Sequence, residues 1–530
     1  MKRLAKILSM IITVSLLAGL FAACGNSQSK SDSSTAASAT STDLTDSTAN
    51  ASGSEKLDQV ELTIFTGGDQ VDQPGFPKVS DEIAKVTADN INVKIDVQTY
   101  AWGDYKTKVD TSLAAGQNID IYLDFSGEFK KDADKKQIIP LDDLIEKYGA
   151  DLKKQIPQDI WNDVKYNGYT YGVPAVYPFV GQDTLMIRGD LREKYGIPEI
   201  KDVDTLNQYL DAIAKNEKGI VGFSAREGRG GCPAAPFINK ETSQNNIKIV
   251  NNDFGDIVSV DYTKKPYKAE SVFESDSTKK AIEWNKQAYA NGWMAKDVLT
   301  QKDPQTLFTS GKSSLYSLDM WTVNSVAPTM EKNIPGCKVE TVPIYDYDNL
   351  VRTRKCNNFA VISSVSKNPE RAMMFLNWIR ASQDNYNLLM YGIKGQDWVP
   401  VDDKNYDLAP GVDPTKRAYN PTPWWFKNQN MDLNLKGTNE QFLKIYNKVL
   451  NAKYITPKII DFSFDSRPVK TQMAQVQTVM LEKWNPVFLG INTSESDFKA
   501  AIDALNKAGL QDIIKEAQKQ LDEWAAVNDK

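Results

Sequence analysis

The chain of 530 residues is 41% hydrophobic and 25% charged, and its 30 glycines and 23 prolines are too few for a collagen-like or wholly disordered protein. It contains no histidine, which excludes Ser-His-Asp and Cys-His nucleophiles and histidine-based zinc sites. With 63 basic and 69 acidic residues the formal net charge is −6, and no long basic run follows the first residues, so we expect no nucleic-acid partner.

The first segment has the pattern of a bacterial export signal. Lys2, Arg3 and Lys6 precede an apolar stretch over residues 7–23, which is typical of a signal peptide and short for a membrane span. The small residues before Cys24 resemble the lipobox, at which the signal is removed and the cysteine thiol is acylated. An ordinary secreted protein with a chance cysteine is the alternative.

Residues 24–57 are rich in Ser, Thr, Ala, Asn and Asp and have almost nothing to bury, so they predict a disordered tether behind the lipidated cysteine. Two acyl chains hold a protein stably on a membrane. We therefore expect a protein anchored by lipid to the extracellular face of the cell membrane, with no other contact to the bilayer.

The globular part begins with alternating strand and helix patterns. Apolar residues alternate over 60–64 and 93–97 and recur over 119–123, which predicts strands, and helical patterns lie between them over 80–88 and 102–113. This order favours a mostly parallel sheet with helices on its faces. Helical spacing is also found at Leu141, Leu144, Ile145 and Tyr148, at Ala372, Phe375, Leu376 and Ile379 behind Asn368-Pro369, and at Ile514, Ala517, Leu521 and Trp524 behind Gly509.

Three cysteines remain after the lipidated one. Cys337 and Cys356 could bridge a short loop, or all three thiols, with Cys232, are unpaired and buried. Their spacing matches no metal motif, and the acidic run that starts at Asp346 lacks the Gly and the closing Glu of a calcium loop. The sequence therefore predicts neither a metal nor another cofactor.

The order of several phrases resembles a known family. The lipidated cysteine and tether are followed by VELTIFTGG, YAWGDYKTKVDTSLAAGQNIDIYLDF, YNGYTYGVPAVYP, LFTSGKSSLYSLDMW, SKNPERAMMFLNWI and LLMYGIKGQDW. Together they are similar to the family 1 extracellular solute-binding proteins of bacterial ABC importers, and the C-terminal part is similar to the larger lipoproteins among them. The resemblance covers nearly all of the chain after Cys24.

The resemblance implies an α/β fold of the two-lobed, type II periplasmic-binding-protein kind, with a ligand cleft between the lobes. We expect lobe 1 to comprise residues 58–178 and 350–400, and lobe 2 to comprise residues 179–349 and 401–530. Ligands bind outside the carboxyl ends of strands in open α/β sheets. The loops 67–70 and 124–127 are therefore expected to face the cleft.

Aromatic and planar polar side chains are the candidates for ligand binding, because sugar rings pack on aromatic faces and their hydroxyls pair with polar groups. Trp321, after a predicted strand, and Trp398 are the stacking candidates, and each could instead fill a core. Trp102 and Trp161 fit packing better. The other candidate ligand-binding residues are Asp69, Asp124 and Arg226 in predicted loops, Tyr177, which could equally support a hinge, and Asp397, where relatives often carry His.

The function that follows is a receptor, with no enzymatic activity, that captures a carbohydrate, most simply an oligosaccharide, and delivers it to the permease subunits of an ABC importer. We expect it to act as a monomer. A receptor for a peptide or another polar solute is an alternative. A surface polysaccharide-degrading enzyme is a further one, because Asp461 and Asp465 could form a carboxylate pair, although that spacing fits a polar turn better.

Replacing Cys24 by Ala tests the anchor. The variant should move from the membrane fraction to the soluble fraction, because it loses the acylated thiol while the tether and globular part are unchanged. If an uncleaved signal retains the variant, a chain that begins near Ser54 replaces it. Sedimentation of that shorter chain with membranes would contradict the lipid anchor.

Overall fold

The computed structural model describes residues 57–529, except residues 69, 127, 226–230, 243–244, 253–254, 354–355 and 415. The predicted signal peptide, the predicted lipidation site Cys24 and the predicted tether up to residue 56 lie outside the described residues. Within the described part, no helix is both long enough and apolar enough to cross a membrane.

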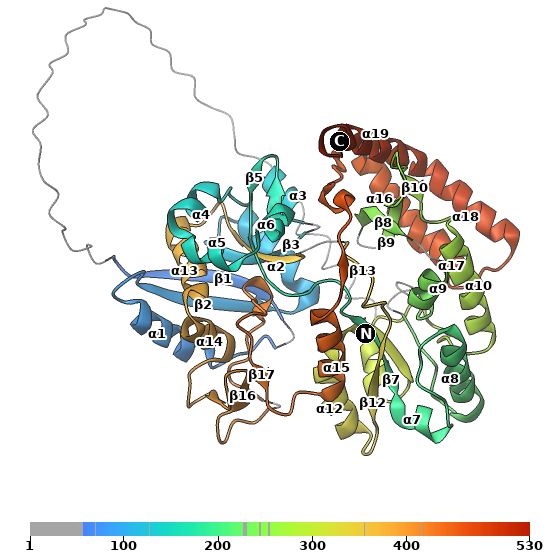
Figure 1. The fold of residues 1–530 in the computed structure, drawn as a ribbon, viewed down its shortest axis with the longest axis horizontal. Helices are drawn as coiled ribbons and strands as arrows, with labels where there is room; N and C mark the ends of the chain where they lie inside the picture. Colours follow the sequence, from blue (N-terminus) through green and yellow to red (C-terminus); the bar gives the residue numbers. More distant parts are fainter. Residues whose placement is uncertain are drawn as a thin grey trace, which may run out of the picture. The chain divides into compact units, whose positions relative to one another are not determined.

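The first sheet has five strands in the order β2-β1-β3-β14-β6. Figure 1 labels three of them, β1, β2 and β3. Its strands are β1 (Val60–Gly67), β2 (Val93–Tyr100), β3 (Ile121–Phe125), β6 (Val173–Pro174) and β14 (Asn358–Ile362). β1 pairs in parallel with β2 and β3, as the sequence predicts, whereas β14 pairs antiparallel with β3. The sheet is therefore mostly parallel at its N-terminal side and takes its fourth strand from a distant part of the chain.

Helices cover this sheet and share one hydrophobic core with it. They are α1 (Phe76–Thr87), α2 (Trp102–Ala114), α4 (Asp142–Tyr148), α5 (Ala150–Gln155), α13 (Pro369–Ala381) and α14 (Gln383–Tyr391). The start of α13 matches the sequence, with Asn368 at the N-cap and Pro369 at the first helical position. Its residues Ala372, Phe375, Leu376 and Ile379 are all buried, which confirms the helical spacing.

A second group of elements surrounds two three-stranded sheets, β11-β7-β12 and β10-β9-β8. Their strands are β7 (Asp183–Arg188), β8 (Asn246–Asn252), β9 (Gly255–Asp261), β10 (Glu270–Ser271), β11 (Leu315–Asp319) and β12 (Val339–Pro343). The main helices are α8 (Val203–Asn216), α10 (Asp276–Ala290), α12 (Val323–Asn333), α15 (Glu440–Leu450), α16 (Lys470–Val479), α18 (Glu495–Lys507) and α19 (Leu510–Asn528). Their buried residues form clusters separate from the first core.

The last helix differs slightly from its predicted face. Gly509, with φ at +102°, precedes α19, a conformation that suits glycine, and Ala517 and Leu521 are buried as predicted. Leu510 and Ile513 complete the buried stripe, whereas Ile514 and Trp524 are only partly buried. The predicted helical period is therefore correct, and the buried face lies about one residue position away from the predicted face.

The segment after α14 packs with the first sheet. Tyr419, Trp425, Phe426 and Met431 are buried in the core of that sheet, although the sequence assigns residues 401–530 to lobe 2. A small sheet of β15 (Trp398–Pro400), β16 (Asn405–Leu408) and β17 (Asn434–Leu435) holds the ends of this stretch together. Only from α15 onwards do the buried side chains join the second group, with Phe442, Ile445 and Tyr446 against Met186 and Phe308.

Candidate functional site

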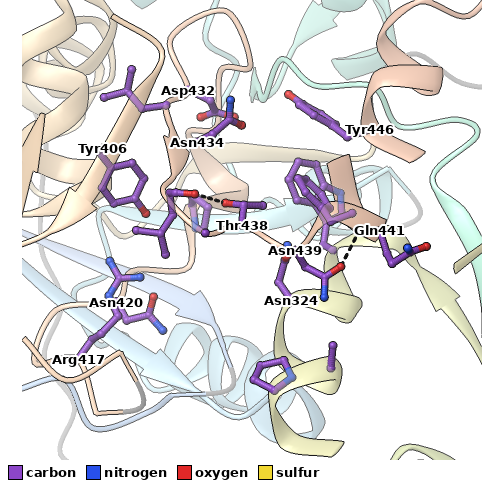
Figure 2. A pocket seen from close by; sticks show the side chains of 18 of the residues that line it. Asn324, Tyr406, Arg417, Asn420, Asp432, Asn434, Thr438, Asn439, Gln441 and Tyr446 are labelled. Carbon is purple, nitrogen blue, oxygen red and sulfur yellow. Dashed lines mark hydrogen bonds between the residues drawn. The ribbon is translucent and has the colours of Figure 1, made fainter. Parts of the chain in front are cut away.

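Trp321 lines a cavity of about 860 Å³, within the range of small-molecule sites. Figure 2 shows this cavity from close by. We call it the Trp321 cavity. Its wall combines α12, α15 and the segment 432–439 with side chains of the segment 417–427. It is therefore built from both the first core and the second group of elements.

Trp321 is placed by the turn that follows β11. The carboxylate of Asp319 accepts hydrogen bonds from the backbone N–H groups of Trp321, at 2.9 Å, and Thr322, at 3.3 Å. Burial raises the pKa of Asp319 above its usual range, and these two bonds oppose the shift. The indole N–H of Trp321 donates to Gln182 at 3.1 Å, so both ends of the residue are held.

The indole ring of Trp321 stands in an aromatic group. Its centroid lies 4.8 Å from that of Phe442, 5.3 Å from that of Tyr446 and 5.8 Å from that of Trp424. All four rings line the cavity. The sequence predicted Trp321 as a site residue but missed Trp424, although the dense aromatic run Trp424-Trp425-Phe426 was a signal for it.

A buried ion pair lies against the same ring. The ammonium group of Lys427 is 2.5 Å from the Asp432 carboxylate and 4.7 Å from the centroid of Trp321. Its side chain is only 5% exposed, so the charge depends on these two neighbours. The other oxygen of Asp432 accepts from the Tyr386 hydroxyl at 2.6 Å. Nothing in the spacing of Lys427 and Asp432 distinguished them from surface charges.

Tyr177 lies behind this group. Its ring packs against Trp424 with centroids 5.6 Å apart, and its side chain is buried. Burial raises the pKa of its hydroxyl well above the usual value. One residue earlier, Val176 donates its N–H to the Lys427 carbonyl at 2.7 Å and accepts from Gln429 at 2.7 Å. Tyr177 and Val176 therefore support the segment that carries Trp424 and Lys427. Direct contact of Tyr177 with a ligand stays a prediction.

Trp398 and Asp397 form part of a small core beside the cavity. Trp398 is 5% exposed, packs with Tyr391 and Tyr406, and donates its indole N–H to the Gly392 carbonyl at 3.0 Å. Asp397 accepts from the N–H of Ile393 at 2.8 Å and closes the turn before the strand. Tyr391 and Tyr406 line the cavity, whereas Trp398 lies one layer behind them. Ligand contact by Trp398 or Asp397 stays a prediction.

Trp102 is more exposed than a packing residue. Its side chain is 41% exposed, yet part of the ring covers Gly67, where a Cβ atom would come within 2.4 Å of it. At the neighbouring Gly68 a Cβ atom would come within 2.3 Å of the Thr422 hydroxyl oxygen. Thr422 stands between two prolines that line the cavity. Trp161, by contrast, is buried in the first core.

Asp124 lies at the end of β3 but is buried. Its carboxylate accepts from the N–H of Phe125 at 2.7 Å, and its second oxygen has no hydrogen-bond partner among the described residues. Burial, followed by the charge of Asp132, raises its pKa well above the usual range. Asp132 itself is paired with Lys106 at 2.9 Å and with Tyr122 at 2.9 Å. A ligand role for Asp124 stays a prediction, and Asp69 and Arg226 lie outside the described residues.

The three cysteine thiols and the carboxylate of Asp465 are held in the folded structure and do not form a site. Cys232, Cys337 and Cys356 are free and buried, so the possible bridge between the last two is absent, and burial raises the pKa of Cys356 to about 12. Asp465 pairs with Arg467 at 2.7 Å in a turn. In the described part of the chain no group of three or more Cys, Asp or Glu side chains is arranged to hold a metal ion.

Comparison with known families identifies the chain. The model of the bacterial extracellular solute-binding proteins matches residues 82–402, more than half of the sequence. The chain belongs to this family. A second family model, described as a domain of unknown function, matches residues 458–526, which include α16, α18 and most of α19. The predicted family is thereby confirmed, and it is a family of binding proteins.

Individual relatives agree with this assignment. A carbohydrate ABC transporter substrate-binding protein of Streptococcus pneumoniae serotype 4 is 25% identical over 526 residues, 96% of each chain. The structure of an N-glycan transport solute-binding protein from Streptococcus pneumoniae has a TM-score of 0.71 at 21% identity, covering 88% of this chain and 99% of that one. An HMO-binding solute-binding protein from Bifidobacterium longum infantis has a TM-score of 0.61 at 15% identity, with 87% and 98% covered. These similarities confirm the two-lobed α/β fold.

Replacing Asp124 by Asn should stabilise the protein at neutral pH. Because the folded state raises the pKa of Asp124, its contribution to stability is present below the ordinary carboxyl pKa and is lost as the pH rises through the raised one. The amide removes this loss, so we expect the melting temperature at pH 7 to rise by about 2 °C or more. The gain should shrink as the pH falls towards about 4.

Asp132→Asn is the matched control, measured in the same thermal unfolding series. It should lower the melting temperature, because it leaves the ammonium group of Lys106 and the hydroxyl of Tyr122 without their charged partner. If Asp124→Asn also lowered the melting temperature at pH 7, the folded protein would need a charged carboxylate at position 124, against the burial argument.

Proposed function

We propose that this solute-binding protein captures an oligosaccharide outside the cell and delivers it to the permease of an ABC importer. The observation that carries the proposal is the pair of indole rings, Trp321 and Trp424, in a cavity that also presents several side-chain amides. These amides belong to Asn324, Asn420, Asn434, Asn439 and Gln441. The C–H face of a sugar packs on an aromatic ring, and amides both donate to and accept from sugar hydroxyls.

The names of the relatives support the same ligand class. The relative from Streptococcus pneumoniae is described as a carbohydrate transporter protein, and the two solved structures as N-glycan transport and HMO-binding proteins. Their identities to this chain, at most 25%, leave the particular sugar open. For this chain the ligand is therefore proposed at the level of an oligosaccharide.

Capture is proposed to work by closure of the two lobes on the ligand. We assign the first sheet, its helices and the segment after α14 up to about residue 436 to lobe 1. We assign the elements from β7 to β12 and the residues from α15 onwards to lobe 2. The chain then crosses between the lobes at 175–182, between β12 and β14, and at 436–440. Since the Trp321 cavity takes side chains from both lobes, a ligand there contacts both of them and favours the closed arrangement.

The receptor is proposed to remain at the cell surface through its lipidated Cys24, as a monomer that meets the permease by turning on its tether. Such an arrangement keeps the ligand-binding part in solution and close to the importer. Of the two carboxylates that the sequence considers for cleavage, Asp465 is engaged by Arg467 at 2.7 Å in a turn.

A panel of oligosaccharides, monosaccharides and peptides, followed by thermal shift and calorimetry, tests the proposed function. Oligosaccharides should raise the melting temperature, since a ligand at about 100 times its dissociation constant stabilises a protein by about 2.7 kcal/mol. Chromatography of the recovered ligand should show it intact. Stabilisation by peptides alone would point to the other receptor class, and shortened sugars would point to an enzyme.

Truncation of Trp321 and Trp398 to Ala separates a ligand platform from a core residue. Trp321→Ala should weaken oligosaccharide binding by roughly thirtyfold, about 2 kcal/mol, because it removes a ring that lines the cavity. Trp398→Ala should cost about 3–5 kcal/mol of folding stability, because its ring is 5% exposed.

Both quantities are measured on both variants, with calorimetry for affinity and urea unfolding for stability. The affinity of the folded fraction of Trp398→Ala should stay within a few-fold of the parent. If instead Trp398→Ala bound weakly with full stability while Trp321→Ala bound normally, the assignment of the platform to Trp321 would be reversed.

A further inference from the structure

One cationic group on the wall of the Trp321 cavity is not part of an ion pair among the residues that the structure describes. Arg417 lines the cavity, is about half-buried, and forms no ion pair with any residue in the described part of the chain. The other cations of the wall are compensated, Lys427 by Asp432 at 2.5 Å and Lys338 by Glu193 at 2.7 Å. Arg417 is therefore the wall's uncompensated positive charge.

Neutral polar groups lie beside Arg417 on the cavity wall. Figure 2 shows the Tyr406 hydroxyl pointing towards the Arg417 guanidinium, with the Asn420 amide next to it. The positive charge of Arg417 lowers the pKa of Tyr406, opposing the larger, raising effect of burial, which indicates that the two groups are close. Tyr406, Asn420 and Asn434 all line the cavity. Together they offer N–H and O–H donors beside a cation that forms no ion pair with a described residue.

The segment that carries Arg417 is fixed before any ligand arrives. The Gln70 side-chain amide donates to the Arg417 carbonyl at 2.8 Å, and the N–H of Gly75 donates to the Ala418 carbonyl at 2.8 Å. The N–H of Asn420 donates to the Gln73 side chain at 3.0 Å. A Cβ atom at position 75 would come within 2.8 Å of the Ala418 carbonyl oxygen, so this close approach requires glycine. The backbone behind Arg417 is therefore preorganised.

We propose that Arg417 forms a subsite for the carboxylate of an acidic sugar residue, a uronic or a sialic acid, within the oligosaccharide. This inference rests on the proposed function and specifies its ligand class. The guanidinium group presents parallel N–H donors that match a carboxylate, and partial burial strengthens such a pair by excluding water. A neutral sugar would satisfy the hydrogen bonds of Arg417 but not its charge.

Matched ligand pairs test the proposal by isothermal calorimetry on the full protein. One pair is an oligosaccharide ending in glucuronate against the same chain ending in glucose, and the other is sialyllactose against galactosyllactose. In the parent protein the acidic member of at least one pair should bind roughly tenfold or more tightly, and that preference should fall as ionic strength rises. Which pair shows the preference distinguishes a uronic from a sialic acid.

Variants of the wall assign the preference to the residue. Arg417→Gln should weaken the acidic ligand on the order of thirtyfold and change the neutral ligand by less than about threefold. Arg417→Lys should retain part of the preference, because it keeps the charge without the planar fork. Glu331→Gln, which removes a carboxylate from the cavity wall, is the matched control and should leave the preference intact or increase it. Equal melting temperatures of the variants exclude misfolding as the cause.

The failures are distinguishable. Equal binding of both members of each pair by the parent protein, or an equal loss of both in Arg417→Gln, would overturn the acidic subsite and leave the oligosaccharide receptor standing. If neither member of either pair bound and the wider panel also held no oligosaccharide ligand, the proposed function would fail, and the subsite with it.

Discussion

The buried ammonium group of Lys427 is the constraint around which the candidate site is built. A buried charge must be paired, and removing one partner of such a pair typically costs about 3–5 kcal/mol. Here the charged partner is the Asp432 carboxylate at 2.5 Å, and the ammonium group also lies 4.7 Å from the centroid of the Trp321 ring. Lys427 lies in the segment after α14, which packs with the first sheet, whereas Trp321 follows β11 in the second group of elements. The Lys427 side chain therefore links the two sides of the cavity.

The backbone of the same residue extends the constraint to a chain crossing. The Lys427 carbonyl accepts from Val176 at 2.7 Å, and Tyr177 then packs on Trp424 with centroids 5.6 Å apart. Movement of the crossing segment 175–182 is thereby linked to the aromatic rings that line the cavity. A receptor that closes on its ligand needs such a link, because the ligand can shift the lobes only through groups that change their contacts between the two arrangements.

The sequence predicted what local patterns determine. Strand alternation located β1 and β2, and Pro369 behind Asn368 marked the start of α13, because these signals lie within a few residues of one another. It could not show that β14 pairs antiparallel with β3, since that register depends on a chain returning from the second lobe. Nor could it separate Trp321 from Trp398: each lies within two residues after an Asp, and only the three-dimensional packing decides that one lines the cavity and the other lies behind it.

The loop of residues 70–75 supports the cavity wall without lining the cavity, and the sequence alone could not show this for the same reason. Gln70, Gln73 and Gly75 lie more than 300 residues before the segment they hold. Gln70 and Gln73 bind its backbone through their side-chain amides, and Gly75 binds it through its own N–H, so no local sequence motif indicates these contacts. Because these contacts fix the segment that carries Arg417 and Asn420, a change in the loop would alter the shape of the wall and leave its lining residues unchanged. The shape of the cavity wall therefore depends on how the loop of residues 70–75 packs against the segment that carries Arg417. The identity of the lining residues alone does not determine that shape.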